Sequence, residues 1–253
     1  MKNNIQLNSF AIEMRKKLKE DLESPIDIFA LINNLKNSTL VFYPMSDRIS
    51  GMCIKEGQSN IIGINSNMSY GRQRFTVAHE LYHLFYEEEL KTVICQKDIY
   101  GQKPDSEKEA DTFASYLLAP YDSLRSYIKE NKLLENKEHI LKDIIDIQQF
   151  YQFSHQAMIY RLMYDGYIDN KLYNSLKRPV SKNAIKLGYD DKLYKPSNED
   201  KKYFSIGEYI QKVELLKEKE LISSGKYEEL LLDAFRADIV YNLGSEDIEI
   251  NDW

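Results

Sequence analysis

The chain has 253 residues, of which 43% are hydrophobic, and its formal net charge is −6 at pH 7. This length suits one large domain or a domain with an appendage, and the acidic balance provides no overall electrostatic attraction for nucleic acid. No apolar run approaches the roughly 20 residues of a membrane-spanning helix, and the N-terminus lacks the apolar core of a secretory signal. Two distant cysteines, Cys53 and Cys95, make no disulfide framework. We therefore expect a globular protein of the cytoplasm, with no membrane association.

The first predicted elements are helices followed by short strands. Apolar residues at three- and four-residue steps predict two helices within residues 9–35, separated at Ser24–Pro25. Three extended segments follow, TLVFYP, SGMCIK and NIIGIN, at residues 39–44, 50–55 and 60–65. The turn-like sequences between these segments predict a small antiparallel sheet.

The chain after the strands is predicted to be mostly helical, which gives an α+β fold class. Residues 72–83 have a helical pattern. A second helix is expected to begin at Ser106, which has capping-box spacing with Glu109, and to end before Pro120. Its apolar stripe consists of Ala110, Phe113, Ala114, Leu117 and Leu118.

The C-terminal third contains few apolar residues at first and then regains a helical pattern. Residues 121–169 indicate further short helices, and the apolar-poor residues 176–204 indicate a linker. Residues 205–253 are expected to form a helical extension, in which two amphipathic helices turn at Ser224–Gly225. Such a pair cannot bury its apolar faces alone, so we expect it to dock on another part of the molecule.

Residues 72–83, RQRFTVAHELYH, contain the spacing of a metal-binding helix. His79 and His83 are four residues apart and share one helix face, so they can offer two imidazoles to one ion. Zinc accepts such nitrogens, and a catalytic zinc typically has three protein ligands and a water. Glu80 stands beside the pair, where its carboxylate can take a proton from that water. The pattern predicts Zn²⁺ as cofactor and Glu80 as general base; the alternative is a chance spacing in an ordinary helix.

The second helix supplies a third candidate ligand, Glu107. At about 100° per residue, Glu107 lies on the same face as Ala110 and Ala114, so its carboxylate points towards a buried surface and needs a partner. One turn further on, Asp111 is placed to accept the ring N–H of a zinc-bound histidine. The alternative for both acids is a favourable interaction with the helix dipole in the first turn.

Four other residues fit the metal site less well. Glu87 lies one turn beyond His83 on the same helix and reaches a shared ion poorly. His139 and His155 are far downstream, where exposure or hydrogen bonding is the simpler expectation. Cys95 lies between the two helices. It could occupy the open coordination position of the metal, but a small buried thiol is the simpler interpretation.

From Asn65 to Pro120 the chain resembles the ImmA/IrrE family of metallo-endopeptidases. The resemblance rests on an Arg-x-x-Phe-Thr lead-in, on the HExxH helix and on the pattern Glu-x-x-Ala-Asp-x-Phe-Ala-x-x-Leu-Leu-x-Pro from Glu107. The spacing of Glu107 and Asp111 also resembles that of the gluzincins, in which the glutamate binds zinc and the second acid supports a zinc-bound histidine. The family usually has Gly before the second histidine. Tyr82 departs from this and is expected to narrow the cleft or to pack into the core.

The resemblance implies a zincin-like domain over residues 1–175 that cleaves one specific cytoplasmic protein. The family is linked to the cleavage of helix-turn-helix repressors of prophages, mobile elements or stress regulons. It also implies that the segment NIIGIN lies near the cleft, where an exposed strand edge would take the substrate as an added strand.

Two other functions compete with this interpretation. The first alternative is a DNA-binding module, because residues 140–168 resemble a helix-turn-helix with Ser154 at the start of a recognition helix. This stretch contains two cations and three aspartates, however, so it lacks the basic face that binds DNA phosphates. We therefore expect a helical pair that closes the domain, and no direct DNA binding. The second alternative is a zinc-containing antirepressor that binds its partner without cutting it. The acidic end, SEDIEINDW, suits a basic partner or is a solvated tail.

Overall fold

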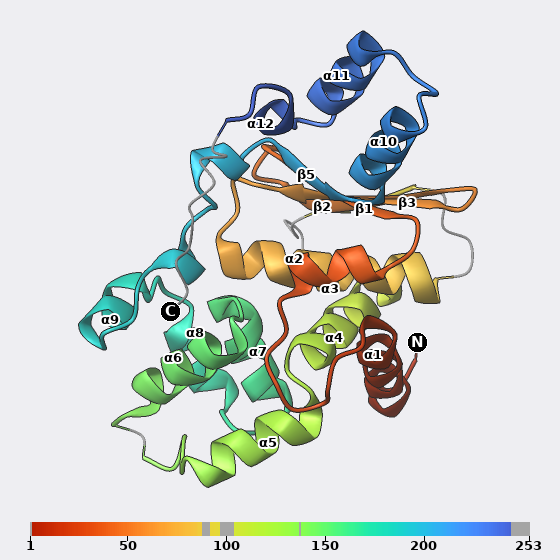
Figure 1. The fold of residues 1–253 in the computed structure, drawn as a ribbon. Helices are drawn as coiled ribbons and strands as arrows, with labels where there is room; N and C mark the ends of the chain where they lie inside the picture. The colour runs from red at the N-terminus through yellow and green to blue at the C-terminus, as the bar shows by residue number, and fades with distance from the viewer. Residues whose placement is uncertain (1, 88–91, 97–103, 137, 244–253) are drawn as a thin grey trace, which may run out of the picture.

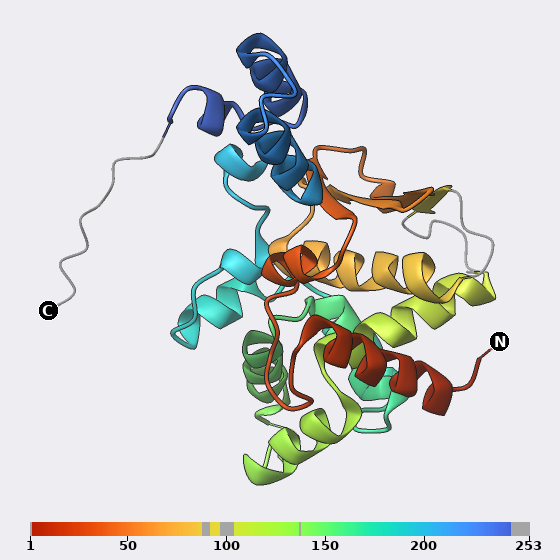
Figure 2. The ribbon, with the colours of Figure 1, turned by 45° about the vertical axis from the view of Figure 1, so that its right-hand side comes forward.

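The computed structural model describes residues 2–87, 92–96, 104–136 and 138–243, with residues 92–96 described by their backbone only. Its centre is a five-stranded sheet (Figure 1). Helices α1 to α9 lie on one side of this sheet and α10 to α12 on the other, as Figure 2 shows from a second direction. The fold is α+β, as predicted.

The sheet is mixed rather than antiparallel throughout. Its strand order is β4-β2-β3-β1-β5, with β1 at Ser38–Tyr43, β2 at Ile49–Glu56, β3 at Ser59–Asn65, β4 at Thr92–Gln96 and β5 at Phe204–Gly207. β2 and β3 form an antiparallel hairpin, but β1 pairs with β3 in parallel, with Leu40 opposite Ile62. The chain crosses over β3 between β1 and β2, and this order makes the β1–β3 pair parallel. The expectation of an antiparallel sheet is therefore wrong for this pair.

The segment NIIGIN is an inner strand and not an edge. It forms β3, which is hydrogen-bonded to β2 on one side and to β1 on the other. Both of its edges are therefore occupied, and the expectation that it takes a peptide as an added strand is wrong. The outer strands are β4 and β5.

The helices nearest the sheet carry the candidate site. α1 covers Asn4–Leu18 and α2 covers Ile28–Leu31, so the predicted break around Ser24–Pro25 is present. α3 covers Tyr70–Tyr86 and packs under β2 and β3, while α4, Asp105–Leu118, packs against both α3 and α1. Pro104, not Ser106, is the N-cap of α4, and it makes no side-chain cap. The predicted capping box is therefore wrong, which leaves Glu109 available for another role.

The outer layer consists of short helices: α5 at Tyr121–Glu130, α6 at Ile140–Tyr151, α7 at His155–Tyr164 and α8 at Asn170–Leu176. Ser154 caps α7 by accepting a hydrogen bond from the backbone N–H of Ala157. Most apolar residues of α6 and α7 are buried in the core, among them Ile144, Ile147, Met158 and Leu162, whereas Phe150, Tyr160 and Tyr164 are exposed. In this part of the chain the two helices pack onto the body, as expected for a pair that closes a domain.

Residues 176–204 contain short elements that pack against the body. α9 covers Ser181–Lys186, and its residue Ala184 is buried with Val180 and Ile145 of α6. The turns η2, Lys192–Tyr194, and η3, Glu199–Lys201, follow. The carbonyl of Lys195 accepts a hydrogen bond of 2.7 Å from the N–H of Tyr70 at the start of α3. This segment therefore contacts the helix that carries the HExxH motif, which a bare linker would not do.

The C-terminal elements dock on the sheet through β5, which pairs with β1. α10, Glu208–Glu218, and α11, Ser224–Asp233, form a helical pair, followed by the short α12 at Ala237–Val240. Two helices were expected here, and their connection lies at residues 219–223, just before the predicted turn. The acidic end from Ser245 lies outside the described residues. None of the described helices is long and apolar enough to cross a membrane.

Candidate metal centre

Helix α3 is enclosed on two sides, which fixes the direction of its polar residues. Its apolar residues Phe75, Val77, Ala78, Leu81 and Leu84 are buried. On the sheet side, β2 approaches closely at Gly51, where an added Cβ would lie 2.6 Å from Thr76 Cγ2 and 3.2 Å from Glu80 Oε1. Glu80 therefore lies beneath β2, while the two histidines of the motif face α4.

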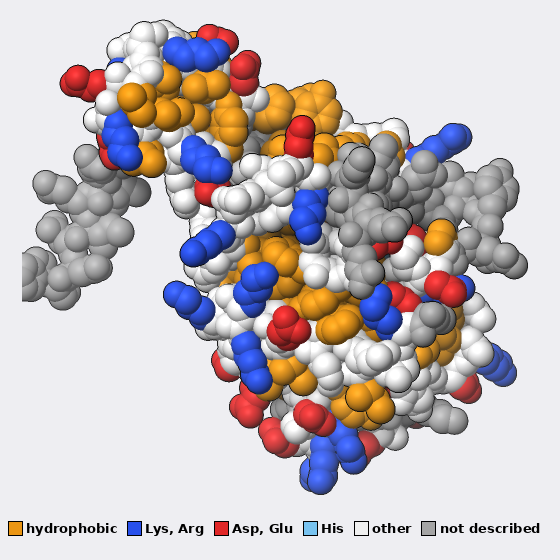
Figure 3. Space-filling view, turned by 90° about the vertical axis from the view of Figure 1, so that its right-hand side faces the viewer, with side chains coloured by type: hydrophobic (Ala, Val, Ile, Leu, Met, Phe, Trp, Pro, Cys, Tyr) orange, Lys and Arg blue, Asp and Glu red, His pale blue; other side chains and the backbone are white. Residues whose placement is uncertain are grey.

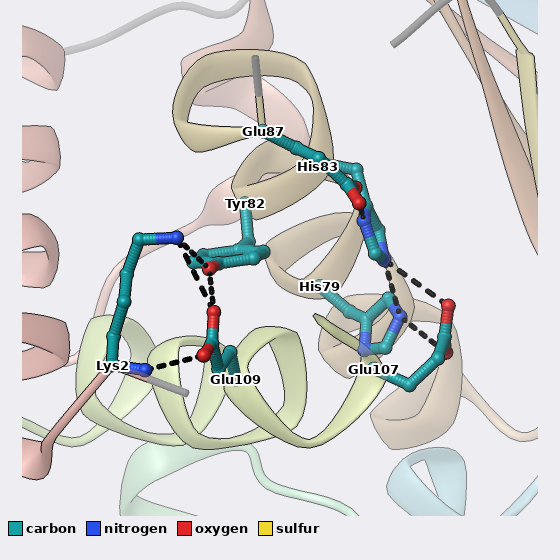
Figure 4. Close-up of polar contacts among 7 residues, drawn as sticks. All are labelled: Lys2, His79, Tyr82, His83, Glu87, Glu107 and Glu109. Atoms are coloured by element: carbon teal, nitrogen blue, oxygen red, sulfur yellow. Dashed lines mark hydrogen bonds and ion pairs between the residues drawn. The ribbon is translucent and has the colours of Figure 1, made fainter. Parts of the chain in front are cut away.

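His79, His83 and Glu107 converge on one point between α3 and α4 (Figure 4). The Nε2 atoms of the two histidines are 3.2 Å apart. Glu107 places Oε2 3.2 Å from His79 Nε2 and Oε1 3.4 Å from His83 Nε2. All three donor groups lie within 4.8 Å of one another. An ion of zinc's size binds such donors at about 2.0–2.2 Å, so small adjustments of these side chains would admit it.

The other ring nitrogen of each histidine contacts a carboxylate. His79 Nδ1 lies 2.9 Å from Asp111 Oδ1, and His83 Nδ1 lies 2.5 Å from Glu87 Oε2. When Nδ1 donates its proton to a carboxylate, Nε2 is the nitrogen left for an ion, and the ring orientation is fixed. The structure therefore places Asp111 where the sequence predicted it. Glu87 has the matching position for His83, and its i, i+4 spacing from that histidine was the signal for it.

The carboxylates make the centre favourable for positive charge. Burial acts to lower the pKa of His79, but Asp111 and Glu107 outweigh it and raise that pKa to about 9. The pKa of His83 is raised in the same way, mainly by Glu107 against the effect of burial. Burial acts to raise the pKa of Glu107, yet the two histidines hold it well below its usual range. The same arrangement of negative charge would attract a divalent cation.

Glu80 is fully buried on the sheet side of α3. Besides Gly51, Glu80 lies close to Cys53 of β2, whose own side chain is buried. Burial, followed by the nearby Glu80 carboxylate, raises the pKa of the Cys53 thiol far above its usual range. Cys53 is therefore a neutral thiol facing the predicted general base. The side chain of Cys95, considered above as a metal ligand, lies outside the described residues.

Tyr82 packs into the core and belongs to a second polar cluster. It is 1% exposed and donates a hydrogen bond of 2.5 Å from its hydroxyl to Glu109 Oε2. The backbone N–H of Lys2 donates to Glu109 Oε1 at 2.5 Å, and Lys2 Nζ lies 2.9 Å from the Tyr82 hydroxyl. Burial acts to raise the pKa of Glu109, but these hydrogen bonds outweigh it and lower that pKa. The capping-box assignment had concealed this role of Glu109.

The remaining histidines take no part in the cluster. His155 is partly buried, with Nδ1 3.2 Å from Gln148 Nε2 and Nε2 2.8 Å from the carbonyl oxygen of Leu176. His139 precedes α6 as its N-cap. Among the described residues, one group of three or more His, Cys, Asp or Glu side chains lies close enough together to hold a metal ion, and it consists of His79, His83 and Glu107. A zinc ion fits this group because of its donor atoms, the carboxylate partners of the two histidine rings and the surrounding negative charge. The assignment of the three residues as zinc ligands stays a prediction.

Comparison with known proteins agrees with this geometry. Residues 26–163 match the model of a peptidase family described as the IrrE N-terminal-like domain. The match begins just before α2 and ends near the end of α7, so it includes the sheet strands β1 to β4 and both helices of the candidate centre. A search of the curated proteins gave no match. The family match covers more than half of the chain, and the chain belongs to the IrrE N-terminal-like family of metallopeptidases.

Proposed function

We propose that this protein is a zinc-dependent endopeptidase whose zinc ion is held by His79, His83 and Glu107. The observation that carries the proposal is the convergence of these three donors, with the second nitrogen of each histidine against a carboxylate. In an ordinary helix, a chance i, i+4 spacing of two histidines would not explain why a half-buried glutamate from another helix contacts the Nε2 atoms of both rings. The membership of a metallopeptidase family supports the same conclusion.

We assign the role of Glu80 from the HExxH pattern, and those of Asp111 and Glu87 from their contacts with the two histidines. Zinc, when bound, acts as a Lewis acid and lowers the pKa of water towards 7. Glu80 accepts a proton from the attacking water while the water oxygen forms a bond to the carbonyl carbon of the substrate. The same carboxyl then gives that proton to the amide nitrogen as the carbon–nitrogen bond breaks. Asp111 and Glu87 keep the rings of His79 and His83 in the orientation that presents Nε2.

The substrate we propose is a helix-turn-helix transcriptional repressor in the cytoplasm, such as that of a prophage, a mobile element or a stress regulon. This rests on the resemblance to the ImmA/IrrE family. The charges of α6 and α7 give a second, indirect argument. Arg161 of α7 is buried and pairs with Asp165 at 2.6 Å, and Lys142 of α6 pairs with Asp146 at 2.7 Å. The helix-turn-helix-like stretch, whose residues 140–168 are all described, therefore has no unpaired Lys or Arg for a DNA phosphate. The chain would then act on a DNA-binding protein and would not itself be one.

The test is cleavage of a helix-turn-helix repressor, with candidates taken first from the genes next to this one. Wild type and Glu80→Gln, both shown to carry zinc, are incubated with the purified repressor, and the fragments are identified by mass spectrometry. We expect one cut, made by wild type alone. An intact repressor in a stable complex with both proteins would contradict the proposal and would support the non-cleaving antirepressor instead.

A further inference from the structure

A second polar cluster holds α3 to α4 beside the candidate metal centre. We call it the N-terminal clamp, and it consists of Lys2, Tyr82 and Glu109. Glu109 accepts hydrogen bonds from the Tyr82 hydroxyl and from the backbone N–H of Lys2, both of 2.5 Å. Lys2 Nζ reaches the Tyr82 hydroxyl at 2.9 Å and Glu109 Oε2 at 3.3 Å. The clamp therefore joins the chain before α1 to α3 and to the first turns of α4.

The clamp and the metal centre use neighbouring residues of the same two helices. Tyr82 precedes His83 on α3, and Glu109 follows Glu107 by two positions on α4. Two residues correspond to about 200° around a helix, so Glu107 and Glu109 leave α4 on opposite sides. Figure 4 shows this division, with Lys2, Tyr82 and Glu109 together on one side and the two histidines with Glu107 on the other.

The N-cap of α4, Pro104, gives its first turn no side-chain hydrogen bond, so contacts with other elements contribute to holding the start of this helix. The far end of α4 is held by Arg15 of α1, whose Nε donates to the carbonyl of Leu117 at 2.8 Å. The segment formed by Lys2 and α1 therefore holds α4 near both ends, and at the start it does so through Glu109.

We propose that Tyr82, Glu109 and Lys2 are positioning residues that fix the rotation of α4 about its axis and so hold the Glu107 carboxylate at the two histidines. A rotation that withdraws Glu107 from His79 and His83 would move Glu109 against the buried hydroxyl of Tyr82. The inference rests on the proposed zinc site. It also gives a function to Tyr82, which replaces the glycine that the resemblance to the ImmA/IrrE family leads one to expect before the second histidine.

The experiment compares two tyrosine variants on the same helix. Tyr82→Phe removes the hydroxyl that joins α3 to Glu109 of α4. Tyr86→Phe is the matched control, because its hydroxyl lies one turn further on and donates to the carbonyl of Phe10 in α1 at 3.0 Å. Both rings pack against Phe113, at centroid distances of 5.6 Å and 5.3 Å. Both variants thus lose a hydroxyl from a ring that packs against Phe113, but only Tyr82→Phe removes the hydrogen bonds that join α3 to the rest of the clamp.

The first readout is the affinity for the zinc ion alone, measured on the full chain by competition with a chromophoric chelator. Loss of a residue that orients a metal ligand typically costs 10–100-fold in affinity, and we expect about 10-fold for Tyr82→Phe and for Glu109→Gln. Lys2→Met changes a side chain that is 36% exposed and is expected to act in the same direction without loss of folding. Tyr86→Phe should bind zinc as wild type does.

The second readout is amide hydrogen exchange in the metal-free protein, read for residues 108–111, the first residues of α4 whose backbone N–H groups have acceptors four residues earlier. Faster exchange there in Tyr82→Phe, and not in Tyr86→Phe, is the expected result. Unchanged exchange and unchanged zinc affinity in Tyr82→Phe, or equal losses in both tyrosine variants, would overturn the clamp. A wild-type chain that binds no zinc would refute the proposed function, and the exchange comparison would still decide whether the clamp holds the start of α4.

Discussion

Two helical pairs of this protein, α3–α4 and α10–α11, have similar apolar patterns but differ in how deeply their apolar residues are buried. The stripes of α3 and α4 are buried, and polar residues buried with them have partners far away in sequence, such as Tyr82 with Glu109. In α10 and α11 the buried residues are Val213 and Leu231, while Leu215, Leu221 and Leu232 in this region are exposed. Figure 3 shows hydrophobic side chains on the surface of these C-terminal helices, at the upper left.

Helical periodicity therefore locates a helix but does not show how deeply the helix is buried. What distinguishes α3–α4 is the polar groups that burial forces to find partners. These groups also make up the candidate centre. We therefore expect substitutions in the first pair to affect activity, zinc binding and stability, and comparable substitutions in the second pair to affect them little.

The largest expected effect is that of Glu80→Gln on cleavage. Removal of a general base lowers kcat by about 10²–10⁴-fold, while the amide keeps the shape of the side chain. Zinc content and thermal stability should remain those of wild type. The matched control is Glu214→Gln in α10, whose carboxylate accepts a hydrogen bond from the Tyr227 hydroxyl at 2.9 Å. If Glu80→Gln cleaved at the wild-type rate, the assignment of the base would be wrong.

Removal of the half-buried carboxylate ligand should come next. Glu107→Ala is expected to weaken zinc binding by more than about 100-fold, since loss of an outer partner alone costs 10–100-fold. Asp111→Asn, which retains the size of the side chain beside His79, should lie within that smaller range. Competition with a chelator measures both variants. Equal affinities of wild type and Glu107→Ala would exclude this residue as a ligand.

A pair of leucine substitutions compares the packing of the two regions. Leu117 of α4 is fully buried, and its replacement by Ala should lower the free energy of unfolding by about 2–5 kcal/mol. Leu215 of α10 is 46% exposed, and the same change there should stay within about 0.5 kcal/mol. Urea denaturation measures both values. A large loss at Leu215 would show that the surface of α10 is covered in solution.

A pair of glycine substitutions gives the smallest expected effects, with opposite signs. Gly51→Ala places a methyl group against Thr76 and Glu80, and such overpacking typically costs about 1–3 kcal/mol. A Cβ added at Gly225 would meet no neighbouring atom within 4 Å, and this residue lies in the first turn of α11. Gly225→Ala should therefore stabilise the protein by up to about 1 kcal/mol. Gly51→Ala should also slow cleavage by displacing Glu80. A neutral result at Gly51 would mean that β2 can move away from α3.

Much of the fold and of the candidate centre could be predicted because local spacing determines them. The i, i+4 histidines, and Glu107 on the inward face of the next helix, are properties of single helices, and the structure brings these residues together. The parallel pairing of β1 with β3 and the addition of β5 depend on how distant segments meet, which periodicity does not specify. Glu109 was assigned to a cap because its true partners, Lys2 and Tyr82, are distant in sequence.

X-ray absorption at the zinc edge of the zinc-loaded protein would identify the ligands of the ion. We expect one zinc ion with two imidazole nitrogens at about 2.0–2.1 Å, oxygen ligands at about 2.0–2.2 Å and no sulfur. His83→Ala should lose one of the imidazole contributions. A sulfur ligand at about 2.3 Å, or a zinc environment unchanged in His83→Ala, would contradict the assignment of His79, His83 and Glu107.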